Sequence, residues 1–246
     1  MTFAAIALLP GLAFGSFLNV VAARVPLRRS VVHPGSACMA CETPLAWHDN
    51  VPIASWTLLR GRCRHCGTSI PWKYPLVELV TALLIGACVL AFGLTGDAAV
   101  AALFCAALIA VSVTDLERKV IPNRIVLPAA VIVLAAQTAL HPSPEWALGA
   151  LGAAIFLLIP AFAYPAGMGM GDVKLALLLG AMLGRTVPVA MLIAMLSALV
   201  PAAVLLVRHG SAARRMAIPF GPFLALGGLV ALFAGERLVN VYLGLF

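Results

Sequence analysis

Long apolar stretches alternate with short polar segments along this chain, and one polar segment, residues 23–74, is much longer than the rest. A helix that crosses the hydrocarbon core of a bilayer needs about 20 predominantly apolar residues, and a broken helix can be shorter. By this measure we predict eight helical spans, with a short sixth one that begins at Asp172. The spans are residues 3–22, 75–94, 97–114, 123–140, 146–165, 172–184, 187–207 and 219–235.

Composition supports an all-α polytopic membrane protein. Of the 246 residues, 63% are hydrophobic and only 10% are charged, and the mean hydropathy is +1.08. These values exclude a soluble domain with a polar surface. The first apolar segment has no basic residue before it, so we expect a retained span and not a signal peptide. We divide the chain into a first transmembrane helix (1–22), a polar loop domain (23–74) and a seven-helix membrane bundle (75–246).

The net charge of +7 comes from basic residues that are spread between the spans and not gathered in one stripe. We therefore expect a lipid bilayer and no nucleic acid as the partner of these charges. With the N-terminus outside, 14 of the 16 lysines and arginines fall on the inner side, and only Arg185 and Arg237 fall outside. The inner residues are Arg24, Arg28, Arg29, Arg60, Arg62, Arg64, Lys73, Arg118, Lys119, Arg124, Lys174, Arg208, Arg214 and Arg215. This asymmetry predicts that both termini lie outside.

Two aspartates stand at span ends that face the same side in this topology. Asp115 ends the third span, and Asp172 begins the sixth after a glycine-rich segment, residues 167–171, that would let an extended backbone approach it. Two carboxylates that share a proton can activate water and protonate a scissile carbonyl, as in aspartic proteases. Two ordinary helix-end charges are the alternative. Glu78, about one turn inside the second span, is either an interior hydrogen-bonding partner or part of a substrate path.

The long loop contains two C-x-x-C pairs, Cys38 with Cys41 and Cys63 with Cys66. The two pairs are separated by 21 residues, which is just beyond the usual spacing of about 15 to 20 for zinc sites. Four thiolates suit a closed tetrahedral zinc site, which would stabilise a loop too small to build its own core. Disulfides are the weaker alternative in a reducing compartment. We expect the two remaining cysteines, Cys88 and Cys105, to pack in the core. No internal repeat is evident in the sequence.

Several motifs occur together in a specific order. The matching segments are Gly15–Val21, the loop with its cysteine pairs, Tyr74–Glu78, Asp115–Asn123, Gly169–Lys174 and Pro219–Phe223. A single G-x-G-D motif would be weak evidence, but the ordered set resembles one family, the bacterial type IV prepilin leader peptidases. These are bifunctional enzymes of the intramembrane aspartic class, and the resemblance covers nearly the whole chain.

This resemblance implies cleavage of the basic leader of type IV prepilins and pseudopilins on the cytoplasmic side of the bacterial inner membrane. It further implies methylation of the new N-terminal residue with S-adenosylmethionine as the methyl donor. Asp115 and Asp172 carry over as the catalytic pair, and the four loop cysteines as the zinc ligands: Cys38, Cys41, Cys63 and Cys66. The sequence has no glycine-rich fingerprint that would locate the methyl donor.

Two other classes of function are compatible with the same residues. One is a small transporter or channel in which Asp115, Asp172 and Glu78 bind a cation or relay protons. The other is a zinc-bearing assembly factor without catalysis, in which the cysteines matter and the aspartates do not. Loss of the leader from a prepilin distinguishes the peptidase from both.

Overall fold

The chain is helical over most of its length in the computed structural model, which describes residues 2–164, 167–210, 216 and 218–244. Among these residues, seven helical segments have the length and apolar composition to cross a membrane. The sixth of them, Met170–His209, contains two helices, α7 (Met170–Leu183) and α8 (Val187–His209), joined by the short turn η3 (Gly184–Thr186). The predicted all-α polytopic fold is therefore confirmed, and the short predicted sixth span corresponds to α7. Pro165, Arg214 and Arg215, which enter the predictions above, lie outside the described residues.

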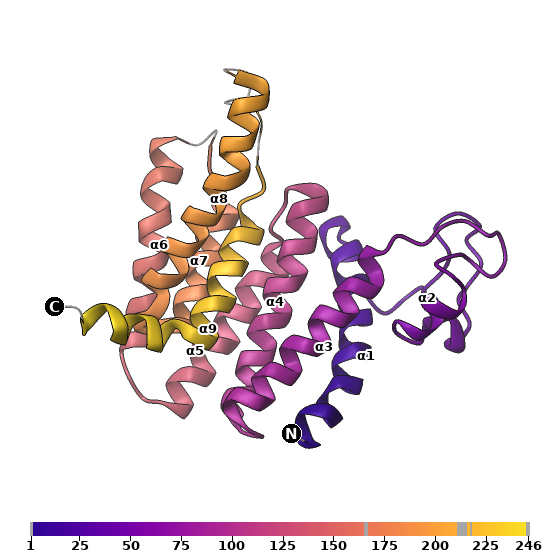
Figure 1. Ribbon diagram of the computed structural model, residues 1–246, viewed down its shortest axis with the longest axis horizontal. Helices are drawn as coiled ribbons and strands as arrows, with labels where there is room; N and C mark the ends of the chain where they lie inside the picture. Colours follow the sequence, from indigo (N-terminus) through magenta and orange to yellow (C-terminus); the bar gives the residue numbers. More distant parts are fainter. Residues whose placement is uncertain (1, 165–166, 211–215, 217, 245–246) are drawn as a thin grey trace. The chain divides into compact units, whose positions relative to one another are not determined.

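The other long helices follow the predicted spans, with ends shifted by a few residues (Figure 1). They are α1 (Thr2–Arg24), α3 (Lys73–Phe92), α4 (Gly96–Arg118), α5 (Asn123–Leu140), α6 (Glu145–Ala163) and α9 (Gly221–Leu243). The polar segment between α1 and α3 contains only short helices, which are η1 (Val25–Leu27), η2 (Trp47–Asn50) and α2 (Ala54–Leu58).

The largest shift is at α9, which continues eight residues beyond its predicted end at residue 235. Glu236 lies in this extension and accepts a hydrogen bond from Arg185, with 3.0 Å between Arg185 Nε and Glu236 Oε1. A single charged residue after the apolar stretch therefore does not mark the end of this helix.

The chain divides into two compact units, residues 1–110 and 111–246, and α4 contributes to both. In the first unit, α1 packs along α3. The two backbones come close at Gly11 and Gly15, because a Cβ on Gly15 would lie only 2.6 Å from the Cα of Glu78. Small residues four positions apart commonly permit such close packing of membrane helices. The α1–α3 pair therefore supports both ends of the polar loop.

The two cysteines outside the loop also lie in the first unit. Cys88 of α3 and Cys105 of α4 are both fully buried, and their Sγ atoms are 3.8 Å apart. They pack in the apolar core as expected.

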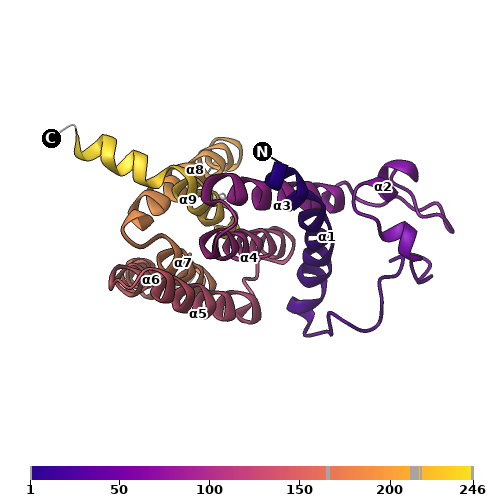
Figure 2. The same cartoon turned by 90° about the horizontal axis from the view of Figure 1, so that it is seen from below.

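In the second unit, α7 is largely buried and packs against α5, α6 and α9, which surround it in Figures 1 and 2. Its side chains Leu175, Leu178 and Leu179 have no exposed surface. The contact with α6 is very close, because a Cβ on Gly180 would lie 2.1 Å from the carbonyl oxygen of Gly149. This packing fixes α7 from several sides, and its first turn holds Asp172.

Candidate active site and metal centre

The two predicted aspartates lie in the second unit and are both buried. Asp115 is in the last turn of α4 with 5% of its surface exposed, and Asp172 is in the first turn of α7 with 8% exposed. The first turn of α7 packs against the segment that follows α4, because a Cβ on Gly171 would lie 2.8 Å from Cβ of Ile121, and this places Asp172 at the same end of the unit as Asp115. The structure thus brings together two acids that are 57 positions apart in the sequence.

Asp172 is held by its own helix end. The amide of Gly169, the N-cap residue of α7, donates to Asp172 Oδ2 at 3.2 Å, and the amide of Asp172 donates to the Gly169 carbonyl at 3.1 Å. A carboxylate in the first turn of a helix is favoured by the unpaired amides there. This part of the G-x-G-D motif is therefore a local capping arrangement.

The sequence suggested that the glycines of this motif leave open space beside Asp172. The structure shows such space at some of these glycines and not at all of them. A Cβ on Gly171 would lie 2.8 Å from Cβ of Ile121, so this glycine is required by packing within the protein. At Gly169 the nearest atom to a Cβ would be Asp172 Oδ2 at 3.6 Å. Room for an approaching backbone thus exists at Gly169 and not at Gly171.

Asp115 is held by a distant segment. Its Oδ2 accepts a hydrogen bond of 2.9 Å from the amide of Gly221, the first residue of α9, and the bond is buried. A Cβ on Gly221 would lie 2.8 Å from the same carboxylate oxygen. The sequence analysis placed Pro219–Phe223 among the motifs of the family resemblance and missed its contact with Asp115. The flanking prolines were the available signal.

Lys174 is tied to another helix of the same unit. Its Nζ donates to Asn123 Oδ1 at 2.9 Å, which joins the first turn of α7 to the first residue of α5. Residue spacing places Lys174 on a different helix face from Asp172 and gives no indication of this partner.

The four loop cysteines form one cluster in the first unit. The Sγ atoms of Cys38, Cys41, Cys63 and Cys66 all lie within 4.8 Å of one another, and the Cys38 and Cys66 sulfurs are 3.7 Å apart. Four sulfurs at this separation can hold a tetrahedral metal ion and leave no position open for water. His65, inside the second pair, is not a member of this cluster.

The two cysteine pairs have the same backbone structure, which corrects the expectation that the chain contains no repeat. Each pair lies in a short hairpin of the loop. In each hairpin the amide of the first cysteine donates a hydrogen bond to the carbonyl of a threonine five positions later, at 3.0 Å for Cys38 and 2.9 Å for Cys63. Glu42 and Gly67, which follow the second cysteines, both have left-handed backbone angles. The spacing C-x-x-C-x-T recurs in the sequence at residues 38–43 and 63–68, so this short repeat is visible in identity as well as in backbone geometry.

In each hairpin a threonine hydroxyl contacts the sulfur of the second cysteine. Thr43 Oγ1 lies 3.3 Å from Cys41 Sγ, and Thr68 Oγ1 lies 3.3 Å from Cys66 Sγ. Hydrogen bonding by Thr68 lowers the pKa of the Cys66 thiol to about 6. A thiol that ionises readily is prepared to ligate a metal, because the thiolate is the ligand.

Three hydrogen bonds fasten the loop to the α1–α3 pair and close it on itself. Glu78, 8% exposed, accepts the amide of Ile53 at 2.8 Å, and Asn19 Nδ2 donates to the Tyr74 carbonyl at 3.1 Å. The indole of Trp56 donates to the Ile70 carbonyl at 3.0 Å. Ile53 has a left-handed backbone angle (φ 58°), which is strained for a β-branched residue. Glu78 is therefore the interior hydrogen-bonding partner that was one of its two predicted roles.

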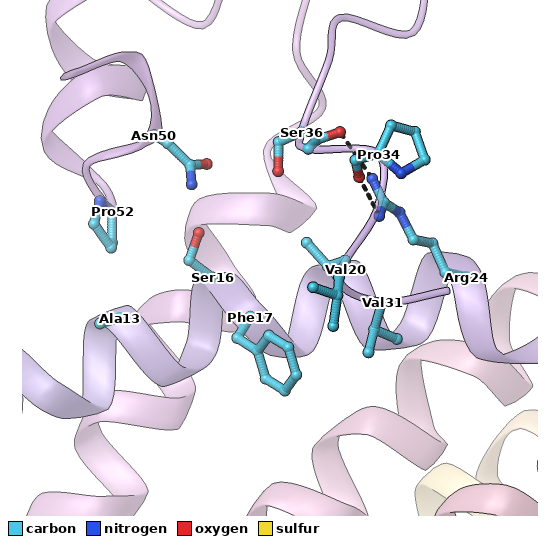
Figure 3. Close-up of a pocket in the computed structure, with 12 residues that line it drawn as sticks. Ala13, Ser16, Phe17, Val20, Arg24, Val31, Pro34, Ser36, Asn50 and Pro52 are labelled. Atoms are coloured by element: carbon cyan, nitrogen blue, oxygen red, sulfur yellow. Dashed lines mark hydrogen bonds between the residues drawn. The ribbon is translucent and has the colours of Figure 1, made fainter. Parts of the chain in front are cut away.

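A cavity of about 480 Å³ lies between α1, the cysteine hairpins and the start of α3. Its lining includes Asn19, Trp56, Tyr74 and Glu78, so Glu78 also faces an open space. A smaller cavity of about 310 Å³ adjoins it and shares Ser16, Val20 and Arg24 of α1 in its lining. There Arg24 donates to the carbonyl oxygens of Pro34 at 2.7 Å and Gly35 at 3.0 Å, as Figure 3 shows.

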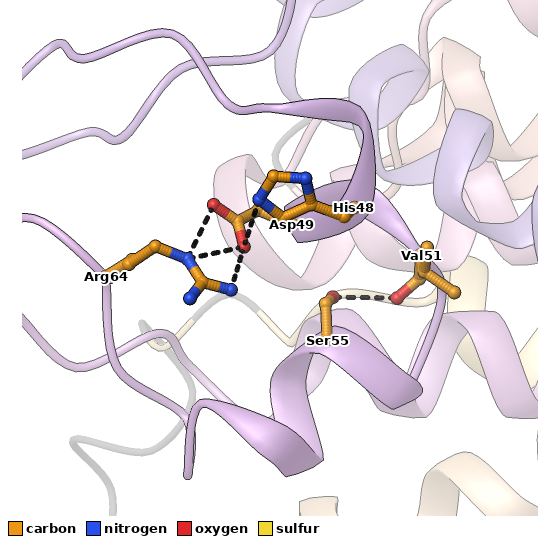
Figure 4. A network of polar contacts seen from close by, with 5 residues as sticks. All are labelled: His48, Asp49, Val51, Ser55 and Arg64. Atoms are coloured by element: carbon orange, nitrogen blue, oxygen red, sulfur yellow. Dashed lines mark hydrogen bonds and ion pairs between the residues drawn. The ribbon is translucent and has the colours of Figure 1, made fainter.

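An ion pair forms part of the wall of the larger cavity. Arg64 donates two hydrogen bonds to Asp49 Oδ1, at 2.7 and 3.0 Å, and His48 lies beside the same carboxylate (Figure 4). The hydrogen bonds from Arg64 hold the pKa of the Asp49 carboxyl below its usual value. The cavity wall therefore keeps a fixed pair of opposite charges near Cys63 and Cys66.

In comparison with known proteins, two family models match successive parts of the chain. Residues 9–92 match the model of the bacterial peptidase A24 N-terminal domain, and residues 102–205 match that of the type IV leader peptidase family. A curated protein of Bacillus subtilis strain 168, named prepilin leader peptidase/N-methyltransferase, is 35% identical over 239 residues, which is 95% of each chain. The chain belongs to the type IV leader peptidase family. This confirms the resemblance seen in the motifs, and with it the assignment as an enzyme.

Other relatives of the same name extend over similar lengths. The protein of Pseudomonas aeruginosa PAO1 is 33% identical over 99% of this chain and 94% of its own length. The protein of Burkholderia pseudomallei strain 1026b is 35% identical over 94% of this chain and 85% of its own length. No solved structure matches the chain. In this leader peptidase, the N-terminal family match contains all four clustered cysteines, and the second match contains both buried aspartates.

Proposed function

We propose that this leader peptidase is an intramembrane aspartic endopeptidase that removes the basic leader of type IV prepilins and pseudopilins. Asp115 and Asp172 are its catalytic pair. The observation that carries this proposal is their arrangement: two buried carboxylates lie at the same end of one compact unit, and each accepts a backbone amide. Buried acids in a membrane protein are costly and are usually kept for function.

Such a pair supports acid–base hydrolysis. Two nearby carboxylates in a poorly hydrated place cannot both ionise easily, so they hold one proton between them. The ionised carboxylate takes a proton from the attacking water while the protonated one donates to the carbonyl oxygen of the scissile bond. The amides of Gly221 and Gly169 hold the two carboxylates in orientation during this exchange.

We place this chemistry at the cytoplasmic face of the bacterial inner membrane, with both termini outside. The charge asymmetry of the segments between the spans supports this orientation, and basic residues such as Arg118 and Lys119 follow Asp115 directly. In this topology residues 1–22 are the first transmembrane helix, residues 23–74 the cytoplasmic loop domain and residues 75–246 the membrane bundle.

The cysteine cluster is proposed to hold one zinc ion. Four sulfurs within 4.8 Å of one another fit the donor set and size of a tetrahedral tetracysteine site. With no ligand position left for water, the metal has a structural role: it links the two hairpins of a loop that contains only short helices.

A second activity, methylation of the newly exposed N-terminal residue, is proposed for the N-terminal part of the chain. The relatives' shared name includes N-methyltransferase, and S-adenosylmethionine supplies an electrophilic methyl group on a sulfonium cation. The cavity of about 480 Å³ has a size typical of small-molecule sites. It offers aromatic faces from Trp56 and Tyr74, the amide of Asn19 and the carboxylate of Glu78, a donor set that suits a cationic adenosyl compound.

The decisive experiment mixes the purified protein in detergent with a prepilin and isotopically labelled methyl donor, and follows the pilin by intact-mass spectrometry. We expect loss of the leader followed by gain of one methyl group. A pilin that keeps its leader under all conditions would overturn the peptidase proposal. Proton or cation flux through reconstituted vesicles without cleavage would instead support the transporter. One of the three acids of that alternative, Glu78, already accepts a hydrogen bond from the Ile53 amide.

A further inference from the structure

The first turn of α9 has an unusual set of backbone donors. The first amides of a helix have no intrahelical partner. Pro222 has no amide, and the amide of Phe223 is bonded to the Phe220 carbonyl at 3.0 Å. The Gly221 amide is thus available, and it donates to Asp115 across 106 positions of sequence.

The shape of this contact requires the absence of a side chain. A Cβ on residue 221 would lie 2.8 Å from Asp115 Oδ2 and 3.3 Å from its Cβ and Cγ. Separations under about 3 Å do not occur for real Cβ atoms, so the carboxylate would have to turn or α9 would have to move. Asp172 has no such dependence, since its amide donor is three positions away in its own helix end.

We propose that Gly221 is a positioning residue for the peptidase reaction. Its amide fixes Oδ2 of Asp115 and sets the rotation of the carboxylate, which leaves the other oxygen to exchange protons with the water or with Asp172. This inference rests on the proposed function of the two aspartates, and it adds α9 as a third helix on which the reaction depends. Gly221 itself touches the carboxylate and is not expected to touch the substrate.

The test measures kcat and KM for leader cleavage in two variants. Gly221→Ala adds the Cβ. The second variant carries glycolic acid at position 221, incorporated by a suppressor transfer RNA. It replaces the Phe220–Gly221 amide by an ester, which removes the N–H without adding a side chain and weakens the Phe220 carbonyl as an acceptor for the Phe223 and Leu224 amides. A hydrogen bond to a charged group contributes enough that we expect kcat to fall about 10- to 100-fold in the ester variant, with KM within about twofold. Gly221→Ala should lose at least as much.

Gly152→Ala is the matched control, because Gly152 is a helical glycine of the same unit and has no atom within 4 Å of an added Cβ. It should cleave like the wild type. If Gly221→Ala does not fold, as judged by thermal unfolding in detergent, the ester variant decides. Wild-type kcat in the ester variant would overturn the positioning role even if Asp115→Asn is inactive. Full activity of Asp115→Asn would instead overturn the proposed function, whatever the Gly221 variants do.

Discussion

The cysteine cluster and the aspartate pair reach their geometry in opposite ways. Each cysteine hairpin is closed by its own backbone, with the first cysteine bonded to a threonine five positions later. The aspartate pair depends on three helices, because Asp115 of α4 is oriented by the first residue of α9 and Asp172 belongs to α7. The comparison teaches that a local motif can specify a metal site, whereas the carboxylate pair is a product of helix packing.

The largest effect that distinguishes the role of the aspartate pair from that of the cysteine cluster should come from neutralising one carboxylate at a time. We expect Asp115→Asn and Asp172→Asn each to lower kcat for leader cleavage by a factor on the order of 10³, because an amide can neither take a proton from water nor return one. Each variant should keep its metal and its ability to methylate a pilin supplied without its leader. Intact-mass spectrometry of the pilin and metal analysis of the enzyme measure all three properties.

Asp97→Asn is the matched control for charge, since Asp97 lies in the first turn of the same helix as Asp115. Cleavage by this variant should stay within about twofold of the wild type, because Asp97 lies at the opposite end of α4 from Asp115. Equal losses at Asp97 and Asp115 would mean that α4 is simply sensitive to lost charge.

Removal of a sulfur should have the complementary effect. We expect Cys38→Ser to reduce the zinc content from about one ion per chain to less than about 0.2, because a closed site that loses one thiolate loses most of its affinity. The loop, residues 23–74, should become sensitive to protease while cleavage falls less than in the aspartate variants. Cys88→Ala, which alters a buried cysteine outside the cluster, should keep its zinc. Retention of a full zinc ion by Cys38→Ser would refute the tetracysteine site.

The same contrast explains what the sequence could predict. Span lengths and C-x-x-C spacing depend on neighbouring residues, so the eight helices and the cluster of Cys38, Cys41, Cys63 and Cys66 were predictable. The end of α9 was placed eight residues too early, just before the charged residue Glu236, which in the structure lies within the helix and pairs with Arg185 of η3. The repeat of the two hairpins was also missed, although the spacing C-x-x-C-x-T occurs at residues 38–43 and again at residues 63–68.

The same division holds within the proposed active site. The positions of Asp115 and Asp172 at the same end of the bundle followed from topology, and the G-x-G-D motif marked Asp172. The partner of Asp115 is an amide, which has no signature in side-chain pattern, and only the prolines beside Gly221 indicated a special turn. Lys174 likewise finds Asn123 through packing of α7 on α5.

A smaller effect tests how the loop is attached to its supporting helices. Glu78→Ala removes the acceptor for the Ile53 amide, so we expect hydrogen exchange at that amide to accelerate by about 10-fold or more, the range for loss of one hydrogen bond to a charged group. Glu78→Gln keeps an acceptor oxygen and should accelerate exchange less. If methylation uses the adjoining cavity, Glu78→Ala should lower it while leader cleavage is nearly unchanged. Unaltered exchange at Ile53 in both variants would show that Glu78 does not hold the loop.

The smallest expected effect concerns the acid limit of the cysteine cluster. The pKa of the Cys66 thiol is about 6 in the folded loop against 9.0 for the ordinary thiol. Because the folded value is the lower one, ionisation of Cys66 favours the folded loop fully above pH 9, and this contribution is lost as the pH falls through about 6. In zinc-free protein, alkylation of Cys66 should therefore stay rapid down to about pH 6. Thr68→Val removes the hydroxyl that stabilises the thiolate, so its alkylation profile should move to higher pH. Thr57→Val is the control, because it removes a hydroxyl that is bonded to the Ile53 carbonyl instead. This variant should leave the alkylation profile unchanged. A common shift in both variants would assign the low pKa to the loop as a whole and not to Thr68.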